Sequence, residues 1–164
     1  MTDIRLAAFN GHSDILRDIL QSTDLSLDAE DGDGRTALNW ASELDYDSVV
    51  RILLDKGAEL NIRGIHHGNA LQAASLEGHT SVVQILLNKG AKVNAQGGKY
   101  GNALQAASEN SHTSVVQILL DKGAEVNAQG GPYGNALQAA LLGGHTLVIQ
   151  MLLDKGAEVD AQGG

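Results

Sequence analysis

The sequence predicts an all-α solenoid of five stacked helix-turn-helix repeats with projecting turns, and two observations carry this prediction. The first is a period of 33 residues, marked by glycine and leucine at Gly57, Gly90, Gly123 and Gly156 and at Leu38, Leu71, Leu104 and Leu137. The second is the near-identity of successive segments, because residues 68–100 and 101–133 match at 27 of 33 positions. The predicted repeats, in a single domain, are 1–33, 34–67, 68–100, 101–133 and 134–164.

Composition narrows the class of protein. The 164 residues are 43% hydrophobic but only 3% aromatic, so the core must consist of Leu, Ile, Val and Ala. The chain has no cysteine, which excludes disulfides and thiol nucleophiles and fits a reducing, cytoplasmic (intracellular) location. No apolar run reaches the roughly 18 residues of a membrane span. The net charge of -9, without a Lys/Arg cluster, disfavours nucleic acid as a partner.

The first helix of each repeat is expected to be short and capped by its own polar residues. In the third repeat, Asn69 and Gln72 have the spacing of a capping box, in which each side chain bonds the backbone N–H of the other. The small residues 73–75 follow, so a neighbouring backbone can approach closely. Gly78 and His79 then end this helix.

The second helix is expected from about Thr80 to Lys89. Its residues are apolar on too many sides for a surface helix, which predicts burial between two neighbouring repeats. Gly90 suits the left-handed position that ends a helix. An extended segment and a turn at 96–100 then lead to the next repeat. Because helices this short are unstable alone, stacking must hold the chain together.

This arrangement resembles the ankyrin repeat over the whole chain. The matching residues are Gly34-Arg-Thr36-Ala-Leu38 and Gly57-Ala-Glu-Leu60-Asn61 in the second repeat, and Gly78-His79, Val82-Val83 and Gly90-Ala91-Lys-Val93-Asn94 in the third. The first motif departs from the family pattern, because Asn-Ala-Leu-Gln replaces Thr-Pro-Leu-His at 69–72, 102–105 and 135–138. The phrase Tyr-Gly-Asn-Ala-Leu-Gln-Ala-Ala further resembles the ankyrin arrays of fungal STAND/NLR-type signalling receptors.

The resemblance implies a non-catalytic module that binds a protein partner through its finger tips and the concave face of its first helices. No cofactor is implied, and no phosphate-binding Gly-rich run or Ser/His/Asp set stands outside the repeat frame. The alternative is a designed or consensus-like scaffold without a natural partner. Identity at 27 of 33 positions fits design and recent duplication equally well.

The candidate partner-binding residues are of two kinds. Large or polar residues at the predicted tips and on the first helix are Trp40, His66, His67, Tyr100 and Tyr133. Positions where the otherwise similar repeats diverge are Glu43, Leu44, Asp45, Leu76, Glu77, Glu109, Asn110, Leu141 and Leu142. Tyrosine is an efficient interface residue, although each tip ring could instead pack against the next finger. Trp40 either anchors a partner or covers the N-terminal repeat, and the acidic members favour a basic or polar partner.

Histidine invites a metal interpretation that the sequence does not support. His12, His79, His112 and His145 recur in register, and we expect each to brace the turn between its two helices. His66 joins His67 at a tip without cysteine or a nearby acidic ligand, so no metal site is predicted there.

The last repeat is expected to lack a polar outer face. Its extra apolar residues are Leu141, Leu142, Leu147, Ile149 and Met151. Since solenoid ends need polar caps, we expect a fragment of a longer array that self-associates through this uncapped repeat.

Overall fold

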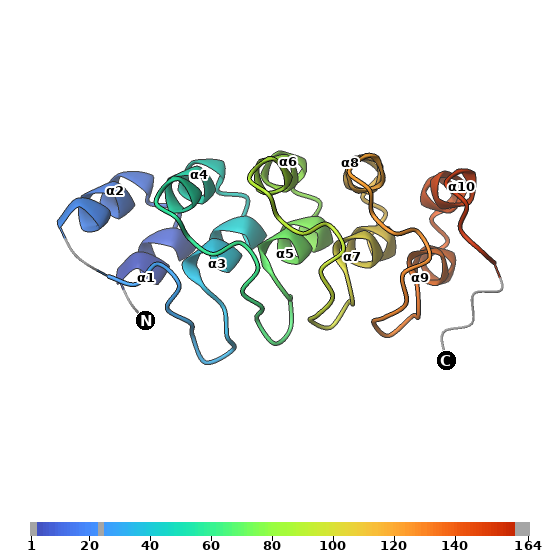
Figure 1. Cartoon of the computed structure of the whole chain (residues 1–164), viewed down its shortest axis with the longest axis horizontal. Helices are drawn as coiled ribbons and strands as arrows, with labels where there is room; N and C mark the ends of the chain where they lie inside the picture. The colour runs from blue at the N-terminus through green and yellow to red at the C-terminus, as the bar shows by residue number, and fades with distance from the viewer. Residues whose placement is uncertain (1–2, 23–24, 160–164) are drawn as a thin grey trace.

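The computed structural model describes residues 3–22 and 25–159, and within these ranges it forms five successive helix pairs (Figure 1). The pairs are α1 (Asp3–Phe9) and α2 (Ser13–Ser22), α3 (Ala37–Glu43) and α4 (Asp47–Asp55), α5 (Ala70–Glu77) and α6 (Thr80–Asn88), α7 (Ala103–Glu109) and α8 (Thr113–Asp121), and α9 (Ala136–Gly143) and α10 (Thr146–Asp154). Each predicted repeat contains one pair, and the all-α solenoid is confirmed. None of these helices is long and apolar enough to cross a membrane.

The odd-numbered helices form an inner row, the even-numbered helices an outer row, and the fingers project beyond the inner row (Figure 1). The inner helices pack closely because small residues stand where they meet, and Ala73, Ala74 and Ser75 are all fully buried. Leucine and valine fill the space between the rows, and the buried core of the described residues contains Leu, Ile, Val and Ala without an aromatic ring. An aromatic-poor sequence therefore suffices for this fold.

The predicted capping boxes form. The Asn69 side chain accepts from the Gln72 N–H at 3.0 Å, and Gln72 Oε1 accepts from the Asn69 N–H at 2.7 Å. Asn102 and Gln105 repeat this geometry at 2.9 and 3.0 Å. Both pairs satisfy backbone donors that a helix N-terminus leaves unpaired.

The glutamine amides do more than cap. Gln105 Nε2 donates to the carbonyls of Ala128, Gly130 and Gly134 at 3.1, 3.2 and 3.1 Å. Gln72 binds the finger that follows its own repeat in the same way, through the carbonyls of Ala95, Gly97 and Gly101. Each glutamine thus joins a first helix to the finger that leads into the next repeat.

The fingers are tight turns. A single backbone hydrogen bond closes each of them, from Gly97 to Gly101 and from Gly130 to Gly134 at 2.7 Å, and from Gly64 to Gly68 at 2.9 Å. Isolated β-bridges occur at two of these closures, so the described residues hold no extended hairpin.

Three of the recurring histidines join neighbouring repeats. The sequence had instead predicted that each braces the turn between the two helices of its own repeat. The Nε2 atoms of His79, His112 and His145 lie 2.8, 2.9 and 2.7 Å from the carbonyl oxygens of Glu43, Leu76 and Glu109. A carbonyl only accepts, so Nε2 carries the proton and donates in each case. Every one of these carbonyls belongs to the last residues of a first helix in the preceding repeat.

Replacing Ser111 by glycine is expected to stabilise the protein by about 0.5–1 kcal/mol. Ser111 has φ 60°, and the equivalent residues in the neighbouring repeats are glycines with φ 79° and 66°, Gly78 and Gly144. The left-handed conformation costs a non-glycine residue about 1–2 kcal/mol, and the extra freedom of unfolded glycine offsets part of the gain. Urea unfolding measures the change. Ser114→Gly is the matched control, because Ser114 lies in α8 and its replacement should destabilise. A loss of stability in Ser111→Gly would contradict the prediction.

Candidate functional site

Trp40 lies in a cluster of aromatic and charged side chains at the N-terminal end of the inner row. Its ring meets that of Phe9 edge-on, with centroids 5.0 Å apart, and the Arg35 guanidinium carbon lies 3.5 Å from its centroid. Its indole N–H donates to Asp31 Oδ2 at 3.0 Å. The Trp40 ring covers part of the first repeat through Phe9, and it is half-buried. Its role as an anchor for a partner stays a prediction.

Asp31 organises the first finger. Burial raises its pKa, but hydrogen bonds from the backbone N–H groups of Arg35 and Asp33 and from Trp40 outweigh burial and hold the pKa below its usual value. The Arg35 side chain approaches the same carboxylate at 3.3 Å. Asp31 therefore stays ionised and fixes the arginine beside the tryptophan.

Glu43 lies beside two basic side chains in this cluster. His67 Nδ1, from the next finger, lies 2.9 Å from Glu43 Oε2, and Arg35 Nη1 lies 4.0 Å from the same atom. His67 thus lies against the end of α3 in the preceding repeat, whereas the alternative to a partner role was packing against the next finger. The expectation that no acidic side chain lies near His66 and His67 was wrong, because the fold brings Glu43 to His67.

Tyr133 occupies the position of His67 two repeats later. Its hydroxyl donates to Glu109 Oε1 at 2.8 Å. This hydrogen bond, together with the negative charge of Glu109, raises the pKa of the Tyr133 phenol above its usual value. The other carboxylate oxygen of Glu109 is buried and has no hydrogen-bond partner.

Tyr100 stands between these two positions in the repeat frame. Lys99 Nζ lies 5.1 Å from the centroid of the Tyr100 ring. Leu76, in register with Glu43 and Glu109, is 8% exposed and shares a hollow with Tyr100. Every tip residue of this series therefore lies beside the end of the preceding first helix.

Two hollows open between the fingers and the ends of the first helices. The Tyr100 hollow, of about 370 Å³, is lined by Leu76, Glu77, Tyr100, Asn110 and His112. The Tyr133 hollow, of about 250 Å³, is lined by Glu109, Asn110, Tyr133, Ala139, Leu142 and Gly143. Asn110 belongs to both, so the hollows adjoin. Seven of the predicted partner-binding residues come together here.

Four other predicted residues lie outside these hollows. Asp45 and His66 are exposed, and Leu44 is half-buried at the end of α3. Leu141 is exposed on the last pair. None of these four lines either hollow. The assignment of partner-binding residues as a whole stays a prediction.

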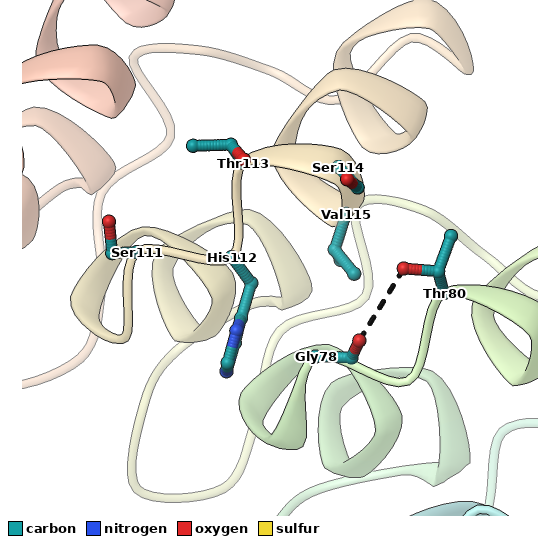
Figure 2. A pocket seen from close by; sticks show the side chains of 7 residues that line it. All are labelled: Gly78, Thr80, Ser111, His112, Thr113, Ser114 and Val115. Carbon is teal, nitrogen blue, oxygen red and sulfur yellow. Dashed lines mark hydrogen bonds between the residues drawn. The ribbon is translucent and has the colours of Figure 1, made fainter.

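A third hollow lies at the turns between paired helices, and Figure 2 shows its lining. His112 points toward the turn of the preceding repeat, where Gly78 leaves room for its ring, and the Thr80 hydroxyl donates to the Gly78 carbonyl at 3.5 Å (Figure 2). Since His112 already bonds the Leu76 carbonyl, this hollow belongs to the brace between repeats. The described residues contain no group of three potential metal ligands.

Short helix pairs stacked side by side, with fingers tied to the next repeat, define a solenoid repeat protein. A family model described as ankyrin repeats (3 copies) matches residues 4–97 and 71–163. The chain belongs to the ankyrin-repeat family, whose repeats are generally protein–protein interaction modules and typically non-catalytic. It is also 32% identical over 60 residues to the ankyrin repeat and SAM domain-containing protein 3 of Homo sapiens. That alignment covers 37% of this chain and 9% of the human protein.

The sequence did not point to four residues that contact the predicted ones. Phe9, Asp31 and Arg35 contact Trp40, and Lys99 lies near the ring of Tyr100. The first three lie in the two most divergent repeats, where the periodic pattern gives the least guidance. Arg35 did carry a signal, because it replaces the glycine found at the equivalent positions Gly68, Gly101 and Gly134.

Proposed function

We propose that this protein is a recognition module that binds a protein partner across the adjoining Tyr100 and Tyr133 hollows. The observation that carries the proposal is the meeting of the two hollows at Asn110, which makes one surface from two repeats. Its lining combines tyrosine rings, acidic groups and the exposed Leu142, a composition that suits a protein interface. The divergence of residues 76, 77, 109 and 110 between near-identical repeats supports a specific role for this surface.

We extend the proposal to the setting of the module. The resemblance of its repeat phrase to fungal STAND/NLR-type receptor arrays favours the recognition part of a larger signalling protein. A chain without cysteine suits the reducing cytoplasm.

Affinity capture with matched variants tests the binding surface. Tyr100→Ala/Tyr133→Ala/Leu142→Ala should lose the proteins that the unmodified protein retrieves from a cell lysate, because it removes the rings of both hollows and the exposed leucine of the Tyr133 hollow. The control is Gln84→Ala/Gln117→Ala/Gln150→Ala, which changes exposed positions of the outer helices. Circular dichroism checks that both variants remain folded. Equal retrieval by both variants would refute the proposed surface.

A scaffold without a natural partner is the second candidate function. Identity at 27 of 33 positions between two repeats motivates it, because a consensus array would look the same as a recent duplication. This candidate predicts that the unmodified protein and both variants retrieve the same proteins in the same amounts.

We also propose that the last repeat associates with a second copy of the chain. Leu141, Leu142, Leu147, Leu153 and Val159 are all exposed there. Light scattering over a range of concentrations tests this, and a strict monomer at high concentration would refute it.

A further inference from the structure

Glu43 and Glu109 occupy the same register two repeats apart, yet their surroundings differ in charge. Glu43 faces two basic side chains, Arg35 from its own repeat and His67 from the next finger. The residues in register with these two around Glu109 are Gly101 and Tyr133. The acidic group is therefore kept while both basic neighbours are replaced by uncharged residues.

The Glu109 carboxylate has a single hydrogen-bond partner and no basic neighbour among the residues that the structure describes. Tyr133 donates to Oε1, and Oε2 is buried without a hydrogen-bond partner, as Glu43 Oε2 also is, but at Glu43 two basic side chains lie close by. A buried carboxylate oxygen without a donor is costly, so a donor entering the hollow would be favoured. Asn110 uses its Nδ2 group to bind the Leu76 carbonyl at 3.3 Å, which leaves its amide oxygen as a further acceptor at the hollow.

At the neighbouring sites, a basic side chain of this protein already lies over the aromatic ring. Arg35 lies over the Trp40 ring, and Lys99 lies near the face of Tyr100. Pro132 stands in register with Lys99, so the equivalent cation is missing beside Tyr133 in the part of the chain that the structure describes. The Tyr133 hollow is lined by acceptors, a ring and apolar groups, and no basic side chain lines it.

We propose that the Tyr133 hollow binds an arginine side chain of the partner polypeptide, placed at Glu109 as Arg35 is placed at Glu43. The inference rests on the proposed function, since the arginine belongs to the bound protein. A planar guanidinium has five N–H donors, enough to serve both oxygens of Glu109 and the amide oxygen of Asn110. It also stacks on an aromatic ring such as that of Tyr133. Leu142, which is 75% exposed, covers the aliphatic stem.

The test uses a defined probe, an acetylated and amidated Gly-Arg-Gly tripeptide, with the matching Gly-citrulline-Gly peptide as an uncharged control. NMR titration of the Leu142 methyl and Tyr133 ring resonances follows binding. The arginine peptide should shift these resonances at about millimolar concentration. The citrulline peptide, which has the same shape without the charge, should not.

Variants separate the specific site from general attraction to an acidic protein. Glu109→Gln should weaken binding by about tenfold or more, because a charge-assisted hydrogen bond is lost. Glu59→Gln makes the same change of net charge at an exposed position in the segment after α4 and should leave binding unchanged. Tyr133→Phe keeps the ring and should bind, whereas Tyr133→Ala should not.

Binding of the tripeptide also has a spectroscopic signature. Because the hydrogen bond to Glu109 and its negative charge raise the pKa of Tyr133, a bound guanidinium should lower that pKa. Ultraviolet titration of the phenol detects this change, and it should be absent in Glu109→Gln.

Three results would overturn the proposal: equal binding of the two peptides, equal weakening by Glu109→Gln and Glu59→Gln, or no shift at Leu142 and Tyr133 at saturating probe. None of them touches the broader proposal, which the capture experiment tests separately. If the triple variant of the hollows loses capture but the arginine tripeptide does not bind, the surface binds a partner by other contacts.

Discussion

Gln105→Ala is expected to lower the free energy of unfolding by about 3 kcal/mol. Gln105 is only 4% exposed. Its amide oxygen accepts from the Asn102 N–H and so caps its own helix, and its amide nitrogen bonds three carbonyls of the following finger. The substitution leaves the Asn102 N–H and three carbonyls without this partner. Each unmet buried group costs about 1–3 kcal/mol, although water can reach the half-buried carbonyls and reduces the sum.

Urea unfolding measures this loss, and Gln117→Ala is its control. Gln117 is an exposed residue of α8 whose amide bonds only Asp121, so its replacement should change stability by no more than about 0.5 kcal/mol. Amide hydrogen exchange adds a local readout, because Asn102 and the finger residues 128–134 should lose protection first. If Gln105→Ala is as mild as Gln117→Ala, the amide does not hold the repeats together.

The capping of the first helices was predictable because it is local. Asn69 and Gln72 are three residues apart, and their roles follow from the geometry of any helix N-terminus. The three further bonds of Gln72 were not predictable in this way. Their acceptors lie 23, 25 and 29 residues downstream, and only the folded path of the finger brings them to the amide. The same reason explains the histidines, whose acceptor carbonyls lie 36 residues upstream.

The sequence indicated which residues belong to the candidate site but not which of them contact one another. Glu109 and Tyr133 were both singled out, one as a divergent position and one as a tip residue. Their contact depends on the stagger between a helix end and the next finger, which no local pattern encodes. The sequence also suggested that Tyr133 and His67 were equivalent, and by register they are. Their chemistry differs because Glu43 has a nearby arginine and Glu109 does not.

Gly101→Ala is expected to destabilise the protein by about 4 kcal/mol, more than a left-handed backbone alone explains. Gly101 has φ 85°, and Gly123, with φ 87°, is its matched control. A Cβ atom on Gly123 would meet nothing within 4 Å, so Gly123→Ala should cost only the conformational strain of about 1–2 kcal/mol. A Cβ atom on Gly101 would collide with Gln105 Oε1 and lie 2.8 Å from the backbone nitrogen of Gly131. Gln105 cannot turn aside without losing its hydrogen bonds.

This cause predicts coupling between the two substitutions. In a Gln105→Ala background the main obstacle is already gone, so Gly101→Ala should cost about 2 kcal/mol less there than in the unmodified protein. The Gly123→Ala cost should be the same in both backgrounds, because that position has no contact with Gln105. Urea unfolding of the four Gly101/Gln105 combinations gives the coupling energy. Additive costs would place the strain of Gly101→Ala in the backbone and at Gly131, and the glutamine would then yield to the new methyl group without loss.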